Sequence, residues 1–320
     1  MLKNTAFVFP GQGTHYSGMG KEIAREFKEA AEIYEMANDI TGVDIKKLCF
    51  EGPDSELVKT ENSQPTIHTT AIAILNVLRK KYGLEGDVTA GFSLGEYSAL
   101  VYGGALKFED TVKLVKKRGL YMQNAVPIGK GKMVAILGLE REEIFKIVEE
   151  CKSLGHIEPS NFNCPGQIIV AGYNKPVEMA AQLALERGAA AANFLSVSGP
   201  FHTMLLLEAG NKLHKELEHI EVINPQIEYV DNVTGDYFKE DEDLRELLRQ
   251  HVFKPVMWED SINSMLDKSV DTFIEIGPKN MLTGLNRRCA EKKGKKVCCY
   301  NVENLKTLND ALRILDKAYA

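Results

Sequence analysis

Short apolar runs alternate with longer amphipathic segments along the chain. The runs at 5–9 (TAFVF), 88–92 (VTAGF) and 271–278 (DTFIEIGP) predict buried strands. A helix is expected from about Lys21, after the glycine-rich loop GQGTHYSGMG, and another over 65–82, where Pro65 would take the first helical position. This alternation of strands and helices predicts an α/β fold.

The pattern changes between residues 129 and 197. Strands are expected at 133–139 and 167–173, helices at 140–155 and 177–189, and a last apolar run follows at 192–199. This β-α-β-α-β order predicts a compact inserted subdomain of ferredoxin-like type. Its hinges would be 129–131 and 198–200. The prediction is therefore a larger domain, made of residues 1–128 and 198–320, that is interrupted by a small subdomain at 129–197.

Composition limits the possible classes of protein. Of the 320 residues, 44% are apolar and 26% charged, which is typical of a globular protein with a buried core. No apolar run is long enough to span a bilayer, and the apolar stretch at the N-terminus is too short for a secretory signal. The six cysteines form no CxxC pair, so we expect free thiols, a cytoplasmic location and no structural metal. A net charge of -6 argues against nucleic-acid binding.

The stretch GFSLG at 91–95 has the spacing of a nucleophile elbow. In such a turn a strand leads into the nucleophile and a helix leaves it at once, and the strand 88–92 and the segment EYSALVYGGAL fit these places. Gly91 and Gly95 would avoid collisions with the neighbouring strand and helix. The N–H of Leu94 would then face an anion formed at Ser93. The alternative is a small polar residue in a glycine-rich loop.

A serine nucleophile needs a base, and histidine is the usual one. His202 lies in SVSGPFHTMLL, where glycine and proline end a strand and a helix follows, and such a loop at the edge of a sheet suits a base. His15 and His251 are the alternatives. His68 lies within an apolar helix and is expected to be structural.

The loop GQG at 11–13 does not fit a phosphate-binding motif. His15 stands where the Walker A motif needs its first glycine, and Glu22 stands where it needs serine or threonine. The loop follows a strand and would expose backbone N–H groups that could complete an oxyanion hole. An ordinary turn is the alternative.

Arg118 falls on the apolar side of a predicted helix. Projected at about 100° per residue, it lies between Leu114 and Met122, while Lys116 and Lys117 point elsewhere. A buried guanidinium needs a partner, because an unpaired buried charge is costly. If no protein carboxylate is near, a substrate carboxylate is the natural one.

Together these segments resemble the malonyl-CoA:acyl carrier protein transacylases of bacterial fatty acid synthesis and the related domains of polyketide synthases. The resemblance covers almost the whole chain. The matching segments are FVFPGQGTHYSGMG, NSQPT, GFSLGEYSAL, KKRGLYMQ, NFNCPGQIIVAG, SVSGPFH, FKPVMWEDSI and IEIGPKNML.

The resemblance implies a fold and a set of roles. The large domain would be α/β-hydrolase-like, with a ferredoxin-like insertion. Ser93 would be the nucleophile, His202 its base, and Arg118 the ligand of the malonyl carboxylate. The remaining implied positions are the oxyanion-hole N–H groups of Gln12 and Leu94, the main-chain carbonyl of Gln250 that orients the histidine, and the pocket residues Gln64, Phe92, Met122, Asn163, Gln167 and Phe201.

The implied reaction is ping-pong transfer of malonyl from malonyl-CoA to the phosphopantetheine thiol of acyl carrier protein, without cofactor or metal. The enzyme is expected to be a cytoplasmic monomer that binds neither nucleic acid nor membrane. Phe92 departs from the family, which usually has histidine there. Phe201 resembles the malonyl-selective pattern. Basic residues at 287–296 and 116–117 could meet the acidic carrier or be solvated charges.

Three alternatives remain open from the sequence. The same residues could serve a polyketide synthase as a separate, trans-acting acyltransferase. They could also release acyl groups to water as a hydrolase. Finally, the chain could be a non-catalytic binding module that has kept the fold.

Overall fold

Alternate residues of strand β1 (Leu2–Phe9) belong to two separate hydrophobic layers of the molecule. The computed structural model describes residues 2–197 and 199–319. Phe7 and Phe9 pack in one core cluster with residues of helices on one face of the sheet, whereas Ala6 and Val8 pack in another on the opposite face. Because successive side chains of a strand point to opposite faces, the large sheet is buried on both sides.

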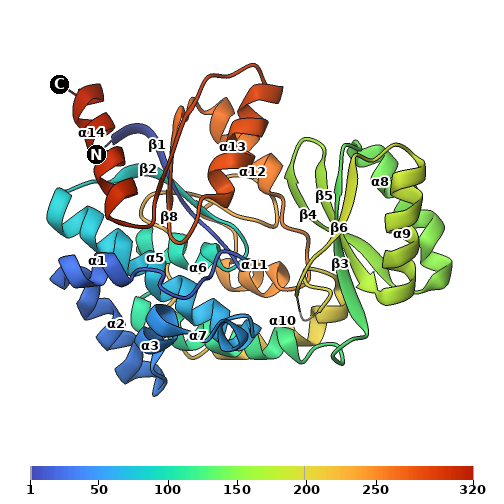
Figure 1. Cartoon of the computed structure of the whole chain (residues 1–320), viewed down its shortest axis with the longest axis horizontal. Coiled ribbons are helices and arrows are strands. Elements are labelled where there is room, and N and C mark those ends of the chain that lie inside the picture. Colours follow the sequence, from blue (N-terminus) through green and yellow to red (C-terminus); the bar gives the residue numbers. More distant parts are fainter. Residues whose placement is uncertain (1, 198, 320) are drawn as a thin grey trace.

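The large sheet is parallel throughout the part of the chain that the structure describes. Its strand order is β7-β2-β1-β8-β9, and each neighbouring pair is parallel (Figure 1). This parallel arrangement confirms the predicted α/β-hydrolase-like class. The other strands are β2 (Gly86–Gly91), β7 (Glu228–Val230), β8 (Thr272–Ile276) and β9 (Cys298–Val302).

Helix α5 begins earlier than the sequence predicts. It spans Thr60–Tyr82, so Pro65 lies inside the helix and not at its first position. Proline removes one backbone hydrogen bond there. The side chains from Ser63 to Leu75 are all buried, and this packing outweighs the loss.

The remaining helices of the large part are α1 (Lys21–Glu26), α2 (Lys28–Thr41), α3 (Ile45–Glu51), α4 (Asp54–Leu57), α6 (Gly95–Tyr102), α7 (Phe108–Gln123), η2 (Met204–Leu206), α10 (Leu207–Leu217), α11 (Leu244–His251), α12 (Trp258–Asp267), α13 (Met281–Lys292) and α14 (Leu305–Tyr319). Among the helices of the described chain, none combines the length and apolar character that crossing a bilayer requires.

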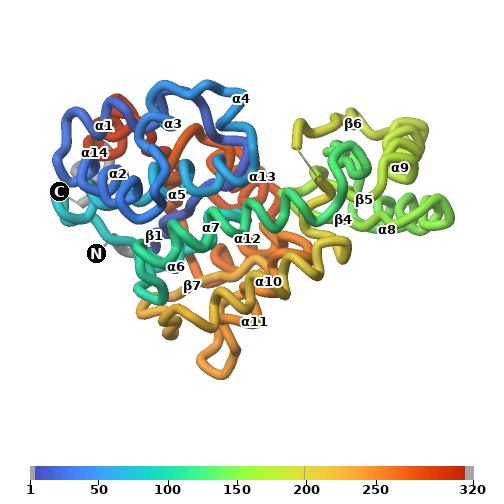
Figure 2. Tube along the Cα trace, turned by 90° about the horizontal axis from the view of Figure 1, so that it is seen from below, coloured from blue at the N-terminus to red at the C-terminus, as the bar shows by residue number. Residues whose placement is uncertain are grey.

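A second, antiparallel sheet stands beside the large one (Figures 1 and 2). Its strand order is β4-β5-β3-β6, and its elements follow one another as β-α-β-β-α-β. This is the topology of a ferredoxin-like unit, as predicted. The elements are β3 (Gly131–Leu137), α8 (Arg141–Cys151), η1 (Lys152–Leu154), β4 (Ile157–Cys164), β5 (Gln167–Tyr173), α9 (Asn174–Glu186) and β6 (Ala191–Phe194).

Strand β4 is absent from the sequence prediction. Pro159, Asn161 and Asn163 break the apolar pattern there. The strand forms the edge of the small sheet, where proline is tolerated because the outer side of the strand is not paired along its whole length. Its pairing with β5 is also irregular at two points, which disturbs the alternation further.

The two faces of the small sheet differ in what they pack against. Val134 and Ile136 of β3 pack with residues of α8 and α9, while Met133 and Ala135 face the other way and line a pocket. The segment at Val256 pairs with β4 through two backbone hydrogen bonds of 2.9 Å. The exact domain boundaries stay a prediction, and Ser198, at the second expected hinge, lies outside the described residues.

Candidate active site

Ser93 lies in a sharp turn between β2 and α6. Its φ angle is 51°, a left-handed conformation that is rare for serine. A Cβ atom added to Gly91 would lie 1.9 Å from the carbonyl carbon of Gly95, and one added to Gly95 would lie 2.0 Å from the main-chain oxygen of Phe9. Both glycines are therefore required by close backbone contacts, for the reason that the sequence suggested.

His202 directs its imidazole to Ser93. The Oγ of Ser93 lies 2.8 Å from Nε2 of His202, although the two residues are 109 positions apart. Nδ1 of His202 lies 2.8 Å from the main-chain oxygen of His251, which can only accept a hydrogen bond, so Nδ1 carries the proton. Nε2 is then free to accept the hydrogen of the serine hydroxyl. Burial, followed by nearby His251 and Arg118, lowers the pKa of His202 well below its usual value, so the imidazole is neutral near pH 7.

The carbonyl that orients His202 differs from the prediction. It belongs to His251 and not to Gln250. The main-chain oxygen of Gln250 already accepts from the N–H groups of Phe253 and Lys254, at 3.0 and 2.8 Å. His251 is the last residue of α11, so its carbonyl lacks a partner within the helix and is available to the imidazole.

Two other histidines, His68 and His15, have different surroundings. His68 is fully buried and bridges the hydroxyls of Ser98 and Thr111, each at 2.8 Å, which agrees with a structural role. His15 lines the pocket at Ser93.

Arg118 is buried beside Ser93, on the apolar side of α7 as predicted. Its side chain is 1% exposed, and it forms no ion pair with any carboxylate of the described residues. Nη1 donates to the side-chain oxygen of Gln64 over 2.9 Å, Nη2 donates to Oγ of Ser93 over 3.3 Å, and the group lies over the Tyr97 ring. Burial lowers the pKa of Arg118, while nearby Tyr97 and Glu96 act in the opposite direction. Arginine keeps its charge in proteins, so the buried group is a cation.

A pocket of about 450 Å³ opens at the Ser93–His202 pair. One wall comes from the small sheet, with Met133, Ala135 and Ile169. Arg118 joins the site through its hydrogen bond to Ser93, and Gln64 joins it through its hydrogen bond to Arg118. The predicted site residues that line the pocket itself are Gln12, Phe92, Ser93, Met122, Asn163, Gln167, Phe201 and His202.

Two backbone N–H groups near Ser93 are unused. Those of Gln12 and Leu94 donate no hydrogen bond to any atom of the described chain. Leu94 immediately precedes the first turn of α6, so its N–H lies at the positive end of that helix. Gln12 is held by its side-chain amide, which donates to the hydroxyl of Thr60 over 3.2 Å.

Sequence reasoning missed the residues behind the serine. The N–H of Ser93 donates to the side-chain oxygen of Asn232 over 2.8 Å, and Glu96 is buried next to Asn232. Glu96 follows Ser93 by three positions, and a carboxyl group in an otherwise apolar helix was a signal that could have identified it.

Phe92, where the resemblance leads us to expect histidine, packs against Trp258. The two rings meet edge to face, with centroids 5.6 Å apart. Phe92 is 8% exposed and also lines the pocket, so it joins a hydrophobic cluster to the wall of the site. This packing gives the aromatic ring at position 92 a partner that suits its apolar surface.

The basic residues near 287–296 divide into two groups. Lys292 and Lys293 are paired with Glu140 and Asp267. Arg288 is exposed and donates to Gln167, which lines the pocket, over 3.0 Å. Positive charge from α13 is therefore one hydrogen bond away from a residue of the pocket lining.

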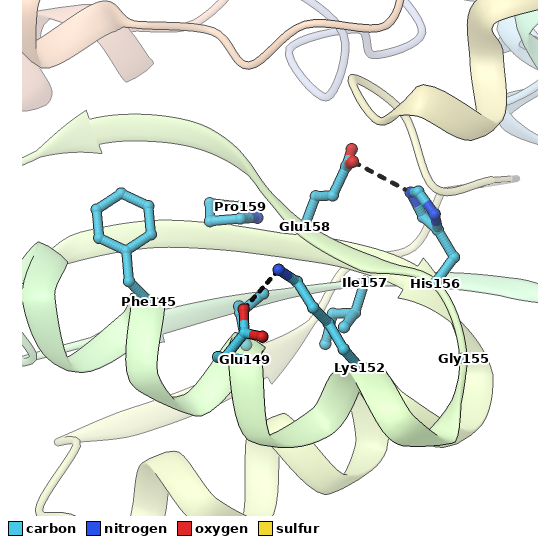
Figure 3. A pocket seen from close by; sticks show the side chains of 9 residues that line it. Phe145, Glu149, Lys152, Gly155, His156, Ile157, Glu158 and Pro159 are labelled. Carbon is cyan, nitrogen blue, oxygen red and sulfur yellow. Dashed lines mark hydrogen bonds and ion pairs between the residues drawn. The ribbon is translucent and has the colours of Figure 1, made fainter.

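A second hollow, of about 580 Å³, lies between α8 and β4 (Figure 3). It contains the bond from Lys152 to Glu149, at 2.5 Å, and the His156–Glu158 pair, at 3.4 Å. It shares no lining residue with the pocket at Ser93. Within the described ranges, no three His, Cys, Asp or Glu side chains are grouped so that they could hold a metal ion.

Comparison with known proteins places this arrangement in a family. Residues 6–313 match the family model described as acyl transferase domain. A malonyl CoA-acyl carrier protein transacylase of Bacillus subtilis is 42% identical over 288 residues, 90% of each chain. The crystal structure of a malonyl CoA-acyl carrier protein transacylase from Clostridium perfringens superposes with a TM-score of 0.94 at 42% identity, covering 98% of both chains.

A third relative is the malonyl-transacylase in a complex with its type II PKS acyl-carrier protein. It matches with a TM-score of 0.91 at 36% identity, over 97% of this chain and 99% of that chain. The matches extend over almost the whole chain, as the order of the sequence motifs indicated. This chain belongs to the acyl transferase family.

Proposed function

We propose that the protein transfers a malonyl group from malonyl-CoA to the phosphopantetheine thiol of acyl carrier protein, through an ester on Ser93. The observation that carries this proposal is the buried Arg118, which has neutral hydrogen-bond partners and lies 3.3 Å from the Ser93 hydroxyl. An acyl group that carries its own carboxylate would supply a negative partner in direct contact with the guanidinium. The names of the relatives support malonyl as that group.

The first half-reaction loads the enzyme. His202 takes the hydroxyl proton as Oγ of Ser93 attacks the thioester carbon. The unused N–H groups of Gln12 and Leu94 would stabilise the resulting oxyanion, each by about 3 to 4 kcal/mol. Collapse breaks the carbon–sulfur bond, and the CoA thiolate takes the proton from His202.

The second half-reaction reverses this order with another thiol. The phosphopantetheine thiol gives its proton to His202, and its sulfur attacks the ester carbonyl. When the carbon–oxygen bond breaks, Oγ of Ser93 recovers the proton. All atoms balance without a metal or redox cofactor, so we propose that none is needed.

We further propose acyl carrier protein as the partner, fatty acid biosynthesis as the pathway, and a cytoplasmic monomer as the working form. The complex of a related transacylase with its carrier protein supports the partner. Within the described chain, all six cysteines are free thiols, which fits a reducing compartment. The positive charge of Arg288 beside the pocket suits an acidic carrier.

Intact-mass measurement tests this function directly. After mixing with malonyl-CoA, the protein should gain one malonyl group, and holo acyl carrier protein should remove it. Ser93→Ala should gain nothing. The proposal fails if no adduct forms, or if the alanine variant gains the same mass.

Hydrolysis is the alternative that the same residues allow. The assay should therefore follow the release of free malonate together with the transfer to carrier protein. Hydrolysis faster than transfer at saturating carrier would contradict the proposal and make the protein a hydrolase. The burial of both reacting groups, with Ser93 9% and His202 3% exposed, favours transfer because it limits access of water to the ester.

A further inference from the structure

Glu96 lies at the centre of a buried hydrogen-bond network behind the reacting pair. It is 2% exposed and lies on α6, one turn after Ser93. Its Oε1 accepts from the hydroxyl of Tyr229 over 2.5 Å and from the N–H of Asn232 over 2.9 Å. Its Oε2 pairs with Nδ1 of His251. Burial alone would raise the pKa of Glu96, but these partners lower it, so the group is a carboxylate.

One branch of the network ends at Ser93. The side chain of Asn232 accepts from the N–H of Ser93 over 2.8 Å and donates to the main-chain oxygen of Gly91 over 2.6 Å. It thus bridges the two sides of the turn. Because Ser93 has a left-handed backbone, the surrounding contacts must hold it in place, and Asn232 supplies two of them.

The other branch ends at His202. The imidazole of His251 packs against that of His202, with centroids 5.2 Å apart and planes 30° apart, and its main-chain oxygen accepts from Nδ1 of His202. His202 also has a positive φ, of 59°. A residue whose side chain is bound to Glu96 therefore determines where the carbonyl acceptor of His202 lies.

We propose that Glu96 and His251 form a buried positioning pair that holds Ser93 and His202 at reacting distance, one through Asn232 and the other through the His251 carbonyl. The inference rests on the proposed function. A change of about 1 Å at a reacting centre can slow a reaction by about 100-fold. The pair does not touch substrate, so its loss should change turnover more than the binding of malonyl-CoA.

A structural role alone makes a different prediction from a positioning role. If a residue merely stabilises the fold, its replacement lowers the unfolding temperature and leaves the kinetics of the folded molecules unchanged. The pair also acts on His202 electrostatically, because His251 lowers the pKa of its neighbour. The charged and titratable groups around His202 are Ser93, Glu96 and Arg118, His251 on α11, and His15 and Lys279 across the pocket.

The test uses His251→Gln and His251→Ala in the full-length enzyme. Both keep the main-chain carbonyl but remove the imidazole. We expect kcat for transfer to fall at least tenfold, KM for malonyl-CoA to change less than threefold, and the acid limb of the kcat/KM profile to move to higher pH. Glutamine, which can still donate to Glu96, should recover part of the activity that alanine loses.

His214→Gln is the matched control. His214 pairs with Glu218 at the end of α10, at 3.9 Å, so this variant removes a histidine–carboxylate pair that shares no residue with the network. Its kinetics should equal those of the wild type. Circular dichroism establishes that each variant is folded, and single labelling of Ser93 by malonyl-CoA establishes the proposed function separately.

The proposal is overturned if a folded His251 variant keeps the kcat and the pH profile of the wild type within twofold. If neither histidine variant folds, Tyr229→Phe decides, because it removes only the hydroxyl that donates to Glu96. It should lower kcat without raising KM, and wild-type kinetics in this variant would equally overturn the proposal. A failure of Ser93 labelling in the wild type would instead reject the proposed function.

Discussion

The guanidinium of Arg118 donates to the side-chain oxygen of Gln64 over 2.9 Å. Gln64 is neutral, so it fixes the direction of the guanidinium without neutralising its charge. The site therefore contains an oriented, buried cation next to a nucleophile. This arrangement can distinguish an acyl group with a free carboxylate from one without.

Arg118→Ala should therefore impair malonyl loading far more than acetyl loading. Truncating one partner of a buried charge pair costs about 2 to 5 kcal/mol, which corresponds to a loss of about 30-fold or more in kcat/KM. Acylation rates with malonyl-CoA and acetyl-CoA give the comparison. Arg118→Lys is the control for charge, because lysine lacks the planar fork. Equal losses for both acyl groups would show that the arginine does not bind the carboxylate.

The pH dependence of loading should reflect the low pKa of His202. Burial holds its pKa well below 6.5, and the neutral form is the base, so activity is retained as the pH falls through 6.5 and declines only at lower pH. Measurement of kcat/KM for malonyl-CoA from pH 4.5 to 8 checks this. An acid limb centred at or above 6.5 would contradict it.

His68 should make the fold sensitive to acid. Burial lowers its pKa to about 3, so the unfolded chain binds a proton near pH 6.5 that the folded chain does not. Stability from this group is complete above pH 6.5 and declines as the pH falls toward 3, by about 1.4 kcal/mol between pH 7.5 and 5.5. Urea unfolding of the wild type and His68→Gln at both pH values measures it. If the variant loses as much stability as the wild type over this range, another group is responsible.

Phe201 should limit the size of the acyl group. Its ring is 5% exposed and lines the pocket directly before His202. Phe201→Ala should raise the ratio of methylmalonyl to malonyl loading by about tenfold or more, because a pocket discriminates one methylene by about 1 to 3 kcal/mol. Competition between the two thioesters, followed by mass spectrometry, gives the ratio. An unchanged ratio would mean that another wall excludes the methyl group.

Features set by neighbouring residues were predictable from the sequence. The turn at Ser93 follows from two glycines and the flanking strand and helix, and the burial of Arg118 follows from the helical period of α7. Both depend on interactions within a few residues. Ser93 and His202 are 109 positions apart, so no local pattern could pair them. The order of the motifs along the chain predicted this pair.

Features set by tertiary contacts were not predictable. Strand β4 is polar because its side chains reach the pocket and the neighbouring segment at Val256, and a polar edge strand has no periodic pattern to detect. Whether Gln250 or His251 offers its carbonyl to His202 depends on where α11 ends. A sequence places the end of a helix only to within a residue or two. One residue is enough to change which carbonyl is free.

The left-handed backbones of Ser93 and His202 have a consequence for how this protein can change. Each of these conformations costs a non-glycine residue about 1 to 2 kcal/mol. Glycine at either position would relieve that cost while removing the chemistry. The two reacting residues therefore make the fold less stable to heat than glycine would. Selection for heat resistance alone would tend to replace them and so remove the activity.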